Sequence, residues 1–389
     1  MPWKELHIMD QKLKFVIKSL SQGVNFTELC CEYGISTKTG YKWKERFLAE
    51  GIEGLHNQSR KPHNNPAQLT EEVVCELIRI KQTKKTWGPK KIRMVYARMH
   101  PGESLPSLST VERVLKKAGF VQPKRRRSRV SLSQRIENPT TPKQPNDLWT
   151  VDFKGWWYTP TKEKCEPLTV RDEYSKYILS IKILENGDIT SVKREFERLF
   201  TKYGLPKVIK SDNGPPFASA RSILGLTRLS AWWMSLGILL DRITPASPQE
   251  NGAHERMHLD IKKELEGKIN GSLKLHQNVF DIWKDEFNTE RPHESLGMKT
   301  PSSVYVKSER VFINDPEYVV YPYEMIRRQV NSRGYIDLKG RRVFISNAFA
   351  AYTIGLKIKS NLFYEVWFYN HYVGEIDLQT YLFKSILDK

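Results

Sequence analysis

The sequence predicts a multidomain protein in which all-α helix-turn-helix units precede an α/β core and a small C-terminal β-barrel. Helical apolar spacing dominates the first 121 residues, whereas runs of β-branched and aromatic residues begin after Asp147. Short apolar runs fill residues 318–382, which is typical of a small barrel. A chain of 389 residues is long enough for several domains.

The first predicted domain, residues 1–52, has a helix-turn-helix pattern. Apolar positions between residues 8 and 20 have helical spacing, a short helix follows, and Ser36 can cap a third helix over residues 37–49. This third helix carries the side chains expected to contact DNA: Lys38, Lys42, Lys44 and Arg46. The alternative is an ordinary three-helix core with a solvated basic face.

A second three-helix unit is predicted over residues 67–121, as a second helix-turn-helix (winged-helix-like) domain. Its helices are expected at residues 69–82, at residues 90–99 after Pro89, and at residues 111–117. Two such units in tandem could span more than one turn of duplex DNA.

Residues 122–146 are predicted to be an extended basic linker that contains four prolines. Its basic cluster is suited to following a phosphate backbone without reading sequence: Lys124, Arg125, Arg126, Arg127 and Arg129. A merely solvated linker is the alternative.

The net charge of +19 favours a polyanionic partner, and double-stranded DNA is favoured over a membrane surface. The charge is uneven, because 26 of the 63 basic residues but only 12 of the 44 acidic residues lie in the first 130 positions. No apolar run approaches the length of a membrane span, and the start lacks the apolar region of a signal peptide. We therefore expect a cytoplasmic location.

The core is predicted over residues 147–310, and residues 316–389 form the predicted barrel. Three successive strands are followed by alternating helices and strands, which is the order of a ribonuclease H-like fold. The expected segments are strands at 148–158, 166–172, 177–184, 207–210 and 238–243, and helices at 189–203, 219–236 and from 252 onward.

Three acidic residues stand at special places in this core. Asp152 lies in the first strand, Asp212 ends the fourth, and Glu255 lies in the first or second turn of the late helix. Carboxylates on a strand, a strand end and a helix can converge, which predicts a metal site. Asp172 is interpreted as a structural residue at a strand end.

Four motifs resemble the integrase core of bacterial insertion-sequence transposases of the DDE type, relatives of retroviral integrases. The motifs are Val-Asp-Phe-Lys-Gly at 151–155, Leu-Thr-Val-Arg-Asp-Glu-Tyr-Ser-Lys-Tyr at 168–177, Ser-Asp-Asn-Gly-Pro-Pro-Phe at 211–217 and Asn-Gly-Ala-His-Glu-Arg-Met-His at 251–258. They occur in the family's order and cover about residues 130 to 310. The interval between the second and third acidic residues is longer than in the commonest members, and the helix predicted at 219–236 is expected to accommodate the insertion.

The resemblance implies that Asp152, Asp212 and Glu255 form a catalytic, metal-binding triad for two Mg²⁺ ions, with Mn²⁺ as a substitute. It implies an enzyme that binds the terminal inverted repeats of a mobile element, frees its 3′ ends and transfers them into target DNA. Joining two ends would need at least a dimer. Lys262 lies two helical turns after Glu255 on the same face and is expected to meet a DNA phosphate, with a solvated lysine as the alternative.

Two other functions are considered. His254 to His258 match the H-E-x-x-H pattern of zinc proteases, but Ile261 and Glu264 stand where the extended pattern has Gly and His. Both histidines are therefore expected on the helix surface or facing DNA. A catalytically inactive DNA-binding repressor with an integrase-like core is the second alternative, against which the complete set of three acidic residues argues.

Overall fold

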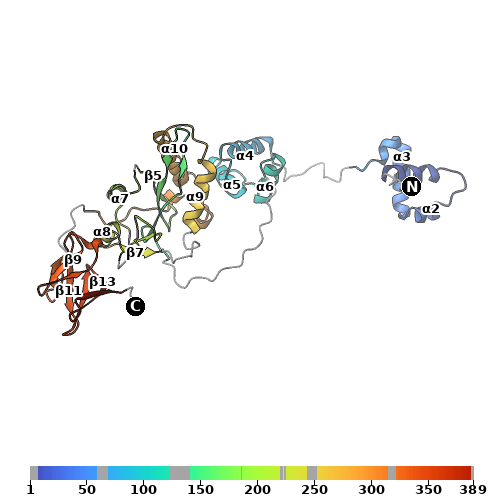
Figure 1. Ribbon diagram of the computed structural model, residues 1–389. Coiled ribbons are helices and arrows are strands. Elements are labelled where there is room, and N and C mark those ends of the chain that lie inside the picture. The colour runs from blue at the N-terminus through green and yellow to red at the C-terminus, as the bar shows by residue number, and fades with distance from the viewer. Residues whose placement is uncertain are drawn as a thin grey trace. The chain divides into compact units, whose positions relative to one another are not determined.

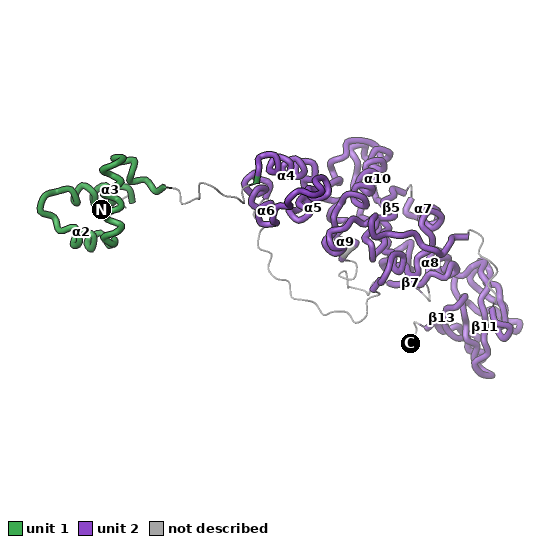
Figure 2. The backbone as a smooth tube through the Cα atoms, turned by 180° about the vertical axis from the view of Figure 1, so that it is seen from behind, with its two compact units in different colours: residues 1–69 green, residues 70–389 purple. Residues whose placement is uncertain are grey.

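The computed structural model describes residues 8–58, 69–121, 141–184, 186–219, 222, 225–242, 252–313 and 321–386. The chain divides into two compact units, residues 1–69 and 70–389, shown in green and purple in Figure 2. The predicted basic cluster from Lys124 to Arg129 lies outside the described residues. No described helix is long and apolar enough to cross a bilayer.

The first unit is the predicted three-helix arrangement. It consists of α1 (Ile8–Ser19), α2 (Phe26–Glu32), α3 (Thr37–Glu50) and the short 3₁₀ helix η1 (Gly51–Leu55). The Ser36 side chain accepts a hydrogen bond from the Thr39 backbone N–H, so α3 starts where the sequence predicts. Phe15 and Val16 are buried in its small core.

The second unit begins with three helices, α4 (Glu71–Thr83), α5 (Pro89–Met99) and α6 (Leu108–Lys117). Ser107 caps α6, which starts earlier than residue 111. These helices contact the α/β core through ion pairs, because Lys84 lies 2.9 Å from Glu286 and 2.8 Å from Glu290.

A five-stranded mixed sheet with the order β5-β4-β1-β6-β7 forms the α/β core. Its strands are β1 (Leu148–Phe153), β4 (Pro167–Asp172), β5 (Ile178–Ile183), β6 (Val208–Ser211) and β7 (Leu239–Arg242). Its helices are α7 (Ile189–Tyr203), α8 (Arg228–Ser235), α9 (Gly252–Glu264) and α10 (Leu273–Thr289), and Figure 1 shows α7 and α10 beside β5. The chain then passes through the 3₁₀ turns η3 (Glu294–Leu296) and η4 (Pro301–Ser303). This arrangement agrees with the predicted ribonuclease H-like order.

Two predicted core elements are shorter in the structure. The first strand ends at Phe153, and the following residues form a separate ribbon of β2 (Trp157–Tyr158) and β3 (Lys164–Cys165). The helix predicted at 219–236 is wrong for its first half, because Gly225 has a left-handed φ of 61° and cannot continue a right-handed helix. A capping box at Thr227 instead starts α8.

The C-terminal part is not the closed barrel that the sequence suggested. Five strands form an open antiparallel sheet with the order β14-β13-β12-β11-β8, and β9 pairs with β10 in a separate two-stranded ribbon. The strands are β8 (Ile326–Gln329), β9 (Tyr335–Leu338), β10 (Arg341–Phe344), β11 (Thr353–Ile358), β12 (Phe363–Phe368), β13 (His371–Asp377) and β14 (Leu382–Ser385), with a 3₁₀ turn, η5 (Asn347–Phe349), between the ribbon and the sheet. The core of this part includes Ala231 and Met234 of α8, so the C-terminal sheet packs against the α/β core.

Candidate active site

Sheet register places Asp152 and Asp212 side by side. Strands β1 and β6 run parallel, and Thr150 pairs with Lys210. Two residues further along each strand, Asp152 and Asp212 therefore lie at the same level, at the carboxyl ends of neighbouring strands that are about 4.8 Å apart. Polar groups at this edge of a mixed α/β sheet are in the usual position for a site.

The Asp212 carboxylate lies in a tight turn. The Gly214 backbone N–H donates to it, and a Cβ at position 214 would lie 3.1 Å from Asp212 Oδ2. Glycine therefore leaves space for the carboxylate. The other oxygen, Oδ1, is buried and has no hydrogen-bond partner among the described residues. A buried carboxylate oxygen without a donor is a position that a cation can satisfy.

His254 attaches the first turn of α9 to β1, the strand that carries Asp152, and to the neighbouring strand β4. The ring is fully buried, with Nδ1 2.8 Å from Thr150 Oγ1 and Nε2 2.7 Å from Thr169 Oγ1. Thr150 belongs to β1 and Thr169 to β4. Because Glu255 directly follows His254, this attachment brings the start of α9 and its exposed carboxylate to the edge that holds Asp152.

The electrostatics agree with three converging carboxylates. Burial, together with the charges of Asp212 and Glu255, raises the pKa of Asp152 to about 7. Burial also raises the pKa of Asp212. Mutual repulsion of this kind is relieved when a divalent cation binds.

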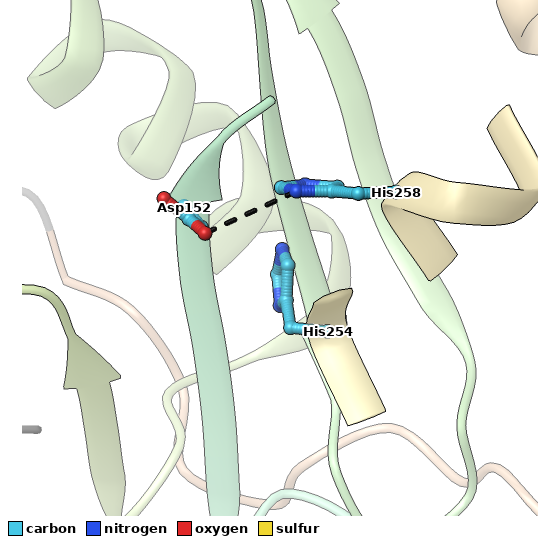
Figure 3. Close-up of side chains that lie close together, drawn as sticks. All are labelled: Asp152, His254 and His258. Carbon is cyan, nitrogen blue, oxygen red and sulfur yellow. Dashed lines mark ion pairs between the residues drawn. The ribbon is translucent and has the colours of Figure 1, made fainter. Parts of the chain in front are cut away.

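His258 lies one turn beyond His254 on α9, and Figure 3 shows its ring directed toward Asp152, with the His254 ring close to both. His258 Nε2 is 2.8 Å from Thr169 Oγ1, and Nδ1 is 4.0 Å from Asp152 Oδ2. Possible ligand atoms of Asp152, His254 and His258 all lie within 4.8 Å of one another. Among the described residues, these three are the group that geometry alone marks as a possible metal site.

Sequence comparison assigns this region to a family. Residues 142–248 and 236–301 match two models of the integrase core domain. Residues 325–382 match the C-terminal domain of IS481 family transposases, residues 11–63 match a helix-turn-helix domain, and residues 39–115 match a homeodomain-like domain.

Relatives from bacterial insertion elements cover much of the chain. The 31.7 kDa protein of element IS407 from Burkholderia multivorans is 24% identical over 255 residues, which are 65% of this chain and 86% of that protein. The 39.2 kDa protein of element IS476 from Xanthomonas euvesicatoria is 25% identical over 257 residues, or 64% of this chain and 69% of that protein. The chain belongs to the bacterial insertion-sequence transposases with an integrase core.

Viral proteins match a smaller share of the chain. The Gag-Pol polyprotein of baboon endogenous virus is 32% identical over 129 residues, which are 31% of the transposase and 7% of the polyprotein. The HTLV-2 integrase catalytic core domain superposes with a TM-score of 0.33 at 20% identity, covering 42% of the transposase and 99% of that domain. The integrase core and the helix-turn-helix regions of the transposase imply that it binds DNA.

The side chains that were predicted to contact DNA differ in their surroundings. Lys38 and Lys42 are exposed on α3, but Lys44 Nζ donates to the Ser19 carbonyl and Arg46 to Gln58 Oε1. The last two side chains therefore hold their own unit together. Lys262 is exposed on α9, seven residues after the exposed Glu255.

Asp172 has the structural role that the sequence indicates. It is fully buried and accepts hydrogen bonds from the Asn146 backbone N–H and from the backbone N–H and hydroxyl of Ser175. It thus fixes the turn after β4 and takes no part in the site.

The prediction that the two histidines lie on the helix surface was wrong. Neither is a surface residue, since His254 is fully buried and His258 is largely buried. Helical spacing alone could not identify their partners, because the two threonines lie on strands far away in the sequence. Both nitrogens of His254 are engaged by hydroxyls, which argues against the zinc protease hypothesis.

Proposed function

We propose that this transposase catalyses metal-dependent cleavage at the 3′ ends of its element and transfer of those ends into target DNA, with Asp152, Asp212 and Glu255 as the catalytic carboxylates. The observation that carries the proposal is the β1–β6 register, which aligns Asp152 with Asp212. The charges of Asp212 and Glu255, which help to raise the pKa of Asp152, support a role for all three carboxylates.

The donor set fits divalent cations that prefer oxygen ligands. Three carboxylates, one of them with an unpartnered buried oxygen, suit Mg²⁺ or Mn²⁺, and the remaining positions would be filled by water and a substrate phosphate. A pair of such ions would activate the attacking oxygen and stabilise the leaving oxygen of a phosphodiester.

The protein's own residues hold the carboxylates in place. Asp152 and Asp212 lie at strand ends of a buried sheet, and His254 fixes the start of α9, the helix that carries Glu255. Rigid placement of this kind lowers the cost of reaching the reactive geometry. We assign exposed Lys262 to a phosphate of the bound DNA end, and the exposed Lys38 and Lys42 to the terminal inverted repeats.

The joining of two element ends to one target requires at least two active sites, and we infer that the active complex on DNA is at least a dimer. Light scattering of the complex on paired ends tests this inference. A monomer on paired ends that still joins both to a target would contradict it.

Nicking and joining of supercoiled plasmid DNA in Mg²⁺ or Mn²⁺ tests the proposed chemistry. Wild type is compared with Asp152→Asn, Asp212→Asn and Glu255→Gln, and Asp285→Asn serves as a control because Asp285 is exposed on α10. We expect each triad variant to lose activity by at least about 10³-fold while retaining DNA binding, and the control to remain active. Nicking and joining by Asp152→Asn at the wild-type level would refute the proposal.

A further inference from the structure

The hydrogen bonds around Thr169 determine the tautomer of His258. The Thr169 hydroxyl donates its only hydrogen to the Asp152 carbonyl oxygen, 2.9 Å away. The Nε2 atoms of His254 and His258 both lie within 2.8 Å of the same hydroxyl oxygen, so each must donate an N–H to one of its lone pairs. A neutral His258 ring with its hydrogen on Nε2 has a free lone pair on Nδ1.

That lone pair faces the Asp152 carboxylate without bonding to it. Nδ1 is 4.0 Å from Oδ2, which is too far for a hydrogen bond, and it makes no hydrogen bond to any other residue that the structure describes. The 4.0 Å separation is the limit of an ion pair, which a protonated ring would form and which a bound cation would replace.

A metal ion bound by both His258 Nδ1 and Asp152 Oδ2 would account for their separation. Two ligand atoms that each lie about 2.1 Å from one ion are about 3 Å apart at a right angle and about 4.2 Å apart when they are opposite. The observed 4.0 Å falls within this range. His254 offers no comparable atom, because a threonine hydroxyl engages each of its nitrogens.

We propose that His258 Nδ1 is a fourth protein ligand, and that it binds the same ion as Asp152, so that the site has mixed nitrogen and oxygen donors. Imidazole binds Mn²⁺ and later transition ions better than Mg²⁺, which prefers oxygen ligands alone. The site therefore selects Mn²⁺ over Mg²⁺ more strongly than three carboxylates would. This inference rests on the proposed function, because it requires Asp152 to bind the ion.

Pulsed electron paramagnetic resonance of Mn²⁺ bound to the full chain tests the inference without measuring catalysis. A directly bound imidazole nitrogen gives ¹⁴N modulation of the electron spin echo. We expect this modulation in the wild type and its replacement by a ¹⁵N pattern when the histidines are ¹⁵N-labelled, a comparison that needs no variant. Mn²⁺ bound with no nitrogen modulation would overturn the inference.

A substitution assigns the nitrogen to His258. His258→Gln keeps an N–H donor for Thr169 but removes the imidazole, and thermal unfolding checks that the variant folds. We expect loss of the modulation, a rise of about tenfold in the Kd for Mn²⁺, and a rise of at most about threefold in the Kd for Mg²⁺. The control is His56→Gln, in the other compact unit, which should change none of these values.

The carboxylate site and the His258 ligand predict different results for the two variants. If Asp152→Asn abolishes Mn²⁺ binding but His258→Gln leaves the modulation and the Mn²⁺ to Mg²⁺ ratio unchanged, the ligand assignment is wrong and the carboxylate site stands. If Asp152→Asn does not weaken Mn²⁺ binding, both the carboxylate site and the role of His258 are refuted.

Discussion

Replacing Asp152 with Asn should stabilise the metal-free protein at alkaline pH while abolishing its activity. Burial and the nearby charges of Asp212 and Glu255 raise the pKa of Asp152 from 3.8 to about 7. A carboxyl group whose pKa is higher in the folded than in the unfolded state favours folding at low pH. This contribution to the free energy of unfolding is complete below the unfolded-state pKa, and it is lost as the pH rises through the folded-state pKa. Stability should therefore fall between about pH 4 and pH 7.

The size of the effect follows from the same values. The difference between 3.8 and about 7 corresponds to about 4 kcal/mol in the free energy of unfolding, and partial exposure of the side chain reduces it to roughly 2 to 4 kcal/mol. The amide that replaces the carboxyl group in Asp152→Asn stays neutral at every pH. The variant should therefore exceed the wild type by this amount at pH 8 and by much less at pH 4.5.

Urea unfolding in EDTA at pH 4.5 and pH 8, followed by tryptophan fluorescence, measures this difference. Trp149 and Trp233 are fully buried in the α/β core and report on its unfolding. Adding Mg²⁺ at pH 8 should stabilise the wild type and leave Asp152→Asn unchanged. The reasoning is refuted if Asp152→Asn is less stable than the wild type at pH 8 in EDTA, or if Asp285→Asn shows the same gain.

Three further predictions concern separate parts of the chain. Lys262→Ala should weaken duplex binding and reduce by about one the slope of log affinity against log salt concentration, while Lys263→Ala should leave this slope unchanged. Fluorescence anisotropy over a salt series measures both slopes, and equal slopes for the two variants would contradict the phosphate contact. Asp172→Asn should cost the core about 2 kcal/mol because a charged acceptor is lost, and an unchanged melting temperature would refute this role. Ser36→Ala should lower the stability of the first unit by about 1 kcal/mol, seen as faster hydrogen exchange in α3, with plasmid nicking unaffected.

Helix starts and the acidic motif could be predicted because the determinants are local. Ser36 caps the helix that follows it within three residues, and Glu255 lies in the first turn of α9, as its position in the sequence predicts. The order of strands and helices likewise follows from patterns within short windows. These signals are sufficient to place Asp152, Asp212 and Glu255 on their elements.

The remaining features depend on contacts between distant segments. His254 is held by threonines 104 and 85 residues away, which no helical pattern can identify. The helix expected at 219–236 fails at Gly225, whose carbonyl accepts from Arg242 on β7. Closure of the C-terminal strands into a barrel depends on pairing between the first and last strands, and a pattern of alternating residues does not determine that pairing.

Replacing Asp212 with cysteine tests whether this carboxylate binds the catalytic metal ion. In Asp212→Cys a thiolate replaces the carboxylate, and thiolates are poor ligands for Mg²⁺ but accept transition ions. We expect plasmid nicking by the wild type in either ion, loss of nicking by the variant in Mg²⁺, and recovery in Mn²⁺ of at least about tenfold over its Mg²⁺ level. Nicking by Asp212→Cys in Mg²⁺ at the wild-type rate would show that Asp212 does not bind the ion, and would contradict the account.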